Sequence, residues 1–125
     1  MYEGDRPIDF GMLRERRASC PGAVAARAAG RVRRPLTGGG LMIIAADHPA
    51  RGALGVNGKP DAMADRYDLL RRLVAALDRP GVDGVLGTAD ILEDLLLLGA
   101  LEDKVVIGSM NRGGLQGATF EIDDR

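Results

Sequence analysis

Three short apolar segments constrain the fold of this 125-residue chain more than any other feature. They are residues 41–46 (LMIIAA), 83–87 (DGVLG) and 104–109 (KVVIGS). The first is apolar throughout, a pattern typical of a parallel strand that is buried on both faces. Stretches with helical periodicity separate the three segments. The order strand, helix, strand, helix, strand predicts a parallel sheet with right-handed crossovers.

Two helices are predicted between these strands. In residues 62–78, apolar side chains recur at spacings of three and four, which places them on one helix face. Asp61 is the expected N-cap of this helix, and Thr88 is the expected N-cap of a second helix over residues 89–99. The second helix contains consecutive leucines at 95–98, so it should pack on more than one side or contact a partner.

A helical lead-in over residues 1–37 precedes the strands. Short helices are predicted over residues 9–18 and 22–29, with Asp9 as a cap of the first. Residues 1–40 carry eight arginines against four acids. An anionic partner or an ordinary pair of solvated helices would account for this charge, and we favour the solvated helices.

The composition excludes several classes of protein. The net charge of −1 argues against a general nucleic-acid or anionic-membrane binder, and no aromatic residues interleave the arginines to stack on bases. No apolar run reaches the length of a membrane span. Cys20 is the only cysteine, so an intramolecular disulfide or a cysteine-based metal site is excluded and a cytoplasmic setting is expected.

Two architectures fit the alternation of strands and helices: an open doubly wound sheet, and part of a (β/α)8 barrel, which in full needs about 250 residues. In both, functional side chains gather at the carboxyl ends of the strands. Asp47 directly follows the first apolar segment, where a partly dry carboxylate can transfer protons or orient a substrate hydroxyl. Capping of the loop through nearby amides is an equally good interpretation of Asp47.

The remaining candidate residues carry weaker signals. His48 is the only histidine, and it is either a substrate contact or a hydrogen-bonded loop residue; alone it cannot form a zinc site. Arg112, in a glycine-flanked loop, can bind a carboxylate or phosphate or belong to an ordinary turn. Lys59 and Lys104 are the only lysines, and neither position suits a Schiff base, which needs a desolvated amine inside the cavity.

Three stretches together resemble a known family. LMIIAADHPARG, DGVLGTADILEDLLLLG and KVVIGSMNRGGLQGATFEIDDR are similar to DeoC/LacD-type class I aldolases of the fructose-bisphosphate-aldolase branch. Within it they resemble actinobacterial aldolase-like barrel proteins, some of them associated with myo-inositol catabolism. The resemblance implies that residues 38–125 are the first three βα units of a (β/α)8 TIM barrel. We therefore expect an incomplete barrel behind the short helical lead-in.

The resemblance also implies a function. The family cleaves carbon–carbon bonds reversibly through a lysine Schiff base, without a metal or other cofactor, and a phosphorylated sugar or keto-deoxy sugar acid is the expected substrate. Asp47 would bind the substrate or help to protonate it, and His48, Asn111 and Arg112 would contact it. The family's Schiff-base lysine belongs to the sixth strand, so we expect it outside this chain. We expect the chain alone to be inactive and poorly behaved, and the intact protein to be a homo-oligomer.

Two other functions compete with the aldolase hypothesis. A non-catalytic, shortened relative of the barrel proteins could act in assembly or interaction, with the leucine-rich helix at 95–98 as its contact surface. A small open-sheet domain that binds a nucleotide or phosphate ranks last, because it needs a glycine-rich turn directly after the first strand. Residues 47–49 (DHP) are not such a turn.

Overall fold

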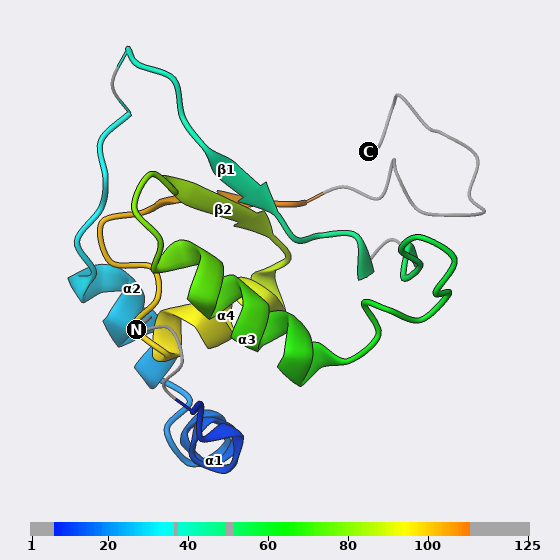
Figure 1. Cartoon of the computed structure of the whole chain (residues 1–125). Coiled ribbons are helices and arrows are strands. Elements are labelled where there is room, and N and C mark those ends of the chain that lie inside the picture. The colour runs from blue at the N-terminus through cyan, green and yellow to red at the C-terminus, as the bar shows by residue number, and fades with distance from the viewer. Residues whose placement is uncertain (1–6, 37, 50–51, 111–125) are drawn as a thin grey trace.

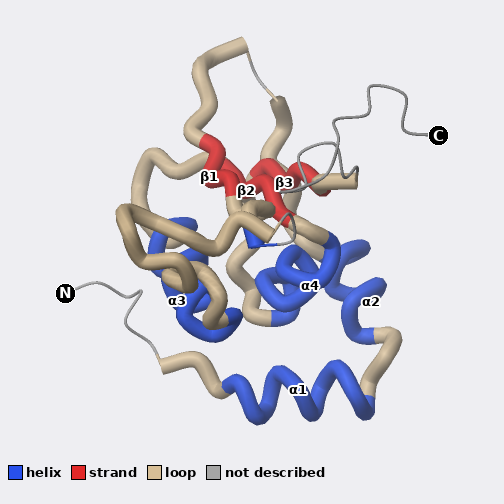
Figure 2. Tube along the Cα trace, turned by 90° about the vertical axis from the view of Figure 1, so that its right-hand side faces the viewer, coloured by secondary structure: helices blue, strands red, loops and turns tan. Residues whose placement is uncertain are grey.

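The computed structural model describes residues 7–36, 38–49 and 52–110. These residues form two layers, a parallel sheet and a group of helices that all lie on one side of it (Figures 1 and 2). The strands are adjacent in chain order, β1-β2-β3. In chain order the elements are α1 (Phe10–Ser19), α2 (Ala23–Gly30), β1 (Ile43–Ala45), α3 (Arg66–Leu77), β2 (Gly84–Gly87), α4 (Ala89–Leu97) and β3 (Val105–Gly108).

Helix α4 lies at the centre of the helical layer. It packs against α2 on one side and α3 on the other, and it also contacts β3. Leu95 is fully buried, Leu96 and Leu97 are at most 9% exposed, and Leu98 packs against the same core. The prediction that this helix packs on more than one side is confirmed. The leucine run therefore serves the interior of the described fold and is not available as the contact surface that the assembly hypothesis required.

The two lead-in helices form within one residue of their predicted positions. Asp9 caps α1 as expected, because its carboxylate accepts a hydrogen bond from the amide of Met12 at 2.9 Å. Phe10 of α1 stacks on Tyr67 of α3, with ring centroids 4.3 Å apart. The lead-in is thus packed onto the rest of the chain and belongs to the same core.

Helix α3 begins later than its periodicity indicated. Its N-cap is Asp65, whose carboxylate accepts hydrogen bonds from the amides of Tyr67 and Asp68. The prediction of Asp61 as the cap is wrong. Both aspartates precede apolar residues at helical spacing, and the backbone of residues 61–64 forms turns, with the amide of Met63 bonded to the carbonyl of Leu54. A long-range backbone bond of this kind leaves no signal in a local sequence pattern.

The first strand is shorter and less buried than predicted. Ile43 and Ile44 are half-buried and Ala45 is exposed, so burial on both faces is wrong for the described chain. Helices cover only the face that carries Ile44, Val85 and Val106. An apolar run predicts that a strand is buried, and it does not specify which polypeptide segments bury it.

The prediction of three opening βα units of an incomplete (β/α)8 barrel is wrong. The described residues form a small domain of three parallel strands and four helices, two of which precede β1. The segment after α2 runs beside the start of β3, where Arg33 forms a parallel bridge with Lys104, and α2 packs against α4. Strand–helix alternation is common to all parallel α/β folds, and it did not reveal that the lead-in completes the helical layer.

Candidate functional site

The carboxyl ends of β1 and β3 bring two polar side chains together. Asp47 lies two residues beyond β1, and Ser109 directly follows β3. The Ser109 hydroxyl donates a hydrogen bond of 3.3 Å to Asp47 Oδ2, and both residues are half-buried. The structure thus places Asp47 at a strand-end site shared by two strands.

The other predicted site residues have different outcomes. His48 is half-buried directly after Asp47, and its carbonyl accepts a hydrogen bond of 3.1 Å from the amide of Ala53. Its role as a substrate contact stays a prediction. Asn111 and Arg112 lie outside the described residues, so the structure does not place them. Ser109 was not among the predicted site residues, although its position after an apolar strand was a usable signal.

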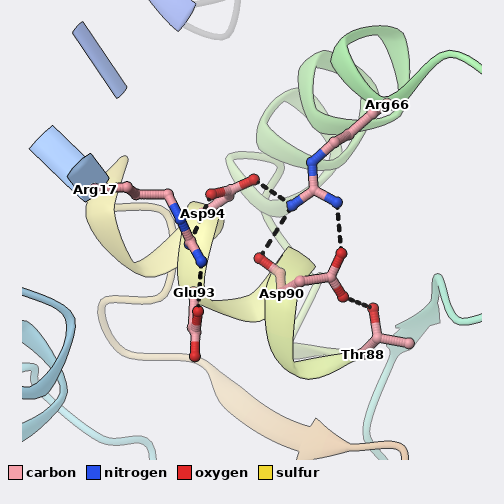
Figure 3. Close-up of polar contacts among 6 residues, drawn as sticks. All are labelled: Arg17, Arg66, Thr88, Asp90, Glu93 and Asp94. Atoms are coloured by element: carbon pink, nitrogen blue, oxygen red, sulfur yellow. Dashed lines mark hydrogen bonds and ion pairs between the residues drawn. The ribbon is translucent and has the colours of Figure 1, made fainter. Parts of the chain in front are cut away.

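A cluster of charged side chains lies between α1, α3 and α4 (Figure 3). Its centre is Asp94, whose side chain is only 5% exposed. Asp94 accepts hydrogen bonds from Arg17 of α1 at 2.9 Å and from Arg66 of α3 at 2.6 Å. The arginines also pair with Glu93 and Asp90 respectively. Three helices are therefore joined through one buried carboxylate.

The pKa values of the cluster follow from these contacts. Burial alone would raise the pKa of Asp90, but the hydrogen bonds from Arg66 and Thr88 outweigh it and hold that pKa below its ordinary value. Burial alone would lower the pKa of Arg66, yet its hydrogen bonds and charge contacts with Asp90 and Asp94 raise it. Thr88 occupies the N-cap position of α4 as predicted, but its hydroxyl bonds to Asp90 and makes no capping bond.

A cavity of about 240 Å³ adjoins the cluster at the carboxyl edge of the sheet. It is lined by Ala46 and Pro49, which flank Asp47-His48, and by Arg66, Thr88 and Asp90 among others. The polar groups in its wall are paired with one another, as the contacts of Arg66 and Thr88 show. We therefore assign the cluster a structural role, in which it joins α1, α3 and α4.

A larger cavity of about 480 Å³ lies at the opposite edge, near the amino ends of the strands. Three charged side chains that line this cavity form hydrogen bonds with backbone groups. Asp9 and Glu102 accept hydrogen bonds from amides, and Lys104 Nζ donates to the carbonyl of Val82 at 2.6 Å. Lys104 is thus hydrogen-bonded near the amino ends of the strands, opposite the edge where a Schiff-base lysine is expected, as its position in the sequence indicated. Lys59 forms a backbone bridge with Val56 in a loop.

The arginines of the lead-in bind groups of the same chain. Arg27 and Arg31 donate to carbonyls at the end of α4 and before β3. Arg34 pairs with Asp83, just before β2, and Arg17 pairs with Asp94. Neither an anionic partner nor simple solvation accounts for these four side chains, because they dock the lead-in onto the strands and α4.

No three His, Cys, Asp or Glu side chains of the described residues are grouped so that they could hold a metal ion. Within the same part of the chain, no helix has the length and apolar character needed to cross a membrane.

Comparison with known proteins now places the chain. The sequence model of the Cgl0159-like family matches residues 39–125. The chain belongs to the Cgl0159-like family. The crystal structure of Cgl0159 from Corynebacterium glutamicum is similar over 93% of this chain, with 61% sequence identity and a TM-score of 0.84. The aligned part is 40% of the Cgl0159 chain, so the present chain spans less than half of that relative. No curated protein matches.

These matches correct the resemblance inferred from the sequence. The family shown is the Cgl0159-like family, and no aldolase family matches, so the assignment to DeoC/LacD-type aldolases is wrong. That assignment depended on short pieces such as DHPARG. A polar loop after an apolar parallel strand is common in α/β folds, so such pieces are weaker signals than a match along most of the chain.

Proposed function

We propose that this chain contributes Asp47 to the active site of a carbon–carbon lyase that acts on a phosphorylated sugar or a keto-deoxy sugar acid. The observation that supports the proposal is the position of Asp47, half-buried at the carboxyl edge and held by Ser109. A carboxylate in that position can accept the proton of a substrate hydroxyl and return it to a product.

The proposed reaction follows aldol cleavage through a Schiff base. A lysine amine condenses with the substrate ketone and releases water, which leaves a protonated imine. Asp47 takes the proton from the hydroxyl on the carbon that becomes an aldehyde. The carbon–carbon bond breaks, and its electron pair passes into the imine to give an enamine. Lys104 is bonded to the carbonyl of Val82 near the amino ends of the strands, and Lys59 lies in a loop, so the proposal assigns the amine to polypeptide beyond this chain.

A hybrid protein tests this proposal, with the present chain in place of the corresponding 40% of Cgl0159. The hybrid is incubated with ketose phosphates and keto-deoxy acids, and aldehyde release is followed with a coupled dehydrogenase. We expect Asp47→Asn to lower kcat by about 100-fold or more, as for loss of a positioned acid–base group. Borohydride should trap substrate on a lysine in both proteins, because Asp47 does not form the imine.

A matched control is Asp61→Asn, which removes a carboxylate from the loop before α3 and should leave kcat unchanged. Cleavage activity that is equal in the hybrid and its Asp47→Asn variant would contradict the role of Asp47. A folded hybrid that cleaves no substrate and forms no borohydride adduct would contradict the lyase proposal as a whole.

We further propose that the protein acts in the cytoplasm. Its single cysteine, Cys20, is a free and exposed thiol, a state that a reducing compartment preserves. The homo-oligomer expected for the intact protein stays a prediction, which light scattering of the hybrid tests.

A further inference from the structure

The face of the sheet opposite the helices is apolar across all three strands. The strand register aligns two rows of residues on it, Ile43–Gly84–Val105 and Ala45–Leu86–Ile107. The residues between them, such as Val85 and Val106, point to the helical core, so side-chain alternation assigns these rows to the other side. We call these six residues the open face.

The open face is incompletely covered by the described residues. Ala45 is exposed and Ile107 is 40% exposed, while Ile43 and Leu86 are half-buried. In Figure 2 the four helices all lie on the other side of the strands. Parallel sheets are almost always buried on both faces, so a parallel sheet with one uncovered face is incomplete.

The side chains of the open face are closely packed, as expected for a surface that another part of a protein covers. A Cβ at Gly84 would lie 2.2 Å from the carbonyl oxygen of Val105 and 2.9 Å from Cδ1 of Ile43. The missing side chain leaves room for Ile43 and Val105 beside the centre strand, and Val105 is only 9% exposed. The open face is therefore a filled, continuous apolar surface and not a gap between strands.

A second copy of this chain is a poor occupant. Three strands about 4.8 Å apart and three or four residues long present roughly 200 Å² on one face. Stable protein interfaces bury about 800 Å² on each partner, so two open faces in contact fall well short. A longer polypeptide can cover the same face and also extend over the strand ends and edges.

We propose that the open face is the docking surface for the polypeptide that makes up the part of a Cgl0159-like protein not spanned by this chain. Cgl0159 shares this domain at 61% identity with a TM-score of 0.84, and 60% of its chain lies outside the match. The occupant presents apolar side chains to Leu86 and Ile107 and excludes water from them. Asp47 and Ser109 lie just beyond the ends of the outer strands, so the same polypeptide borders their side chains.

The test compares the chain alone with the hybrid in which it is joined to the rest of Cgl0159. Hydroxyl-radical labelling reports the exposure of individual side chains. We expect Leu86 and Ile107 to be labelled in the chain alone and protected at least about fivefold in the hybrid. Met12, which is 62% exposed on α1, should be labelled equally in both.

Substitution gives a second measurement. Ile107→Lys should lower the Tm of the hybrid by about 10 °C, because a lysine would be buried there without a partner, and should shift the Tm of the chain alone by less than about 2 °C. Met12→Lys should shift neither. Equal labelling of Ile107 in the two proteins, or equal Tm shifts for Ile107→Lys, would overturn the proposal.

Self-association gives a third result. A stable dimer of the chain alone that Ile107→Lys dissociates would assign the open face to a second copy and would also overturn the proposal. Should the hybrid not fold, labelling of full-length Cgl0159 at the positions equivalent to Leu86 and Ile107 decides the question: protection supports docking, and full labelling refutes it. Because labelling and Tm do not depend on activity, these results stand apart from the lyase proposal.

Discussion

Replacing Asp94 with asparagine tests whether the charged cluster holds the helices together. Asp94 accepts one hydrogen bond from Arg17 and one from Arg66, at 2.9 Å and 2.6 Å, and its side chain is 5% exposed. Asparagine keeps the shape of the side chain and loses its charge. Two arginines then face a neutral amide that can accept from only one side.

The expected loss of stability follows from the burial of each partner. Breaking a buried ion pair by changing one partner costs about 3–5 kcal/mol. The side chains of Arg17 and Arg66 are 33% and 42% exposed, so water compensates both in part, and each keeps a second carboxylate partner. We therefore expect Asp94→Asn to lower the free energy of unfolding by about 2 kcal/mol, a value below that range because of this discount.

Urea-induced unfolding, followed by circular dichroism at neutral pH, measures this change. Glu93→Gln is the matched control, because Glu93 pairs with the same Arg17 and is 39% exposed. We expect it to cost less than about 1 kcal/mol, as for exposed ion pairs. A change below about 0.5 kcal/mol for Asp94→Asn, or equal losses of stability for the two variants, would refute the conclusion that Asp94 holds the three helices together.

Two further predictions follow from the structure. The pKa of Asp90 is lowered in the folded chain, so its contribution to stability is present above the ordinary aspartate pKa of about 4 and is lost as the pH falls through the lower folded value. Between pH 6 and pH 3 the free energy of unfolding should therefore decrease less for Asp90→Asn than for the unchanged chain. Equal decreases in the two proteins would contradict this. Gly84→Ala should lower the free energy of unfolding by more than about 3 kcal/mol or abolish soluble expression, because the new Cβ would overlap the backbone of Val105. A Cβ at Gly108 would have no heavy atom within 4 Å, so Gly108→Ala should leave the Tm unchanged in a thermal unfolding assay of both variants. Similar Tm values for the two variants would show that the strands are not packed as described.

Local patterns in the sequence were sufficient to predict most of the helices and strands. Both lead-in helices, the capping role of Asp9 and the central strand positions depend on residues within a few places of one another, and the structure has them. The start of α3 was wrong because Asp61 and Asp65 are locally similar as caps. Only the turns of residues 61–64 and the bond from Met63 to Leu54 distinguish them.

The candidate site shows the same division. Asp47 could be selected from the sequence because it follows an apolar strand. Its hydrogen-bond partner Ser109 is 62 positions away and meets it only because β1 and β3 flank the same central strand. Charge counts likewise showed an arginine-rich lead-in, but not that Arg17 reaches Asp94 of α4. No local rule connects residues so far apart.

The sequence by itself determined that this chain builds parallel strands with a polar group at the end of the first one, because strand and cap preferences are properties of neighbouring residues. The tertiary structure decided that four helices cover one face of the sheet and leave the face of Leu86 and Ile107 open. Which face a helix covers is set by packing among distant segments. The apolar run of the first strand predicted burial on two sides, and in the described chain the helices cover only one of them.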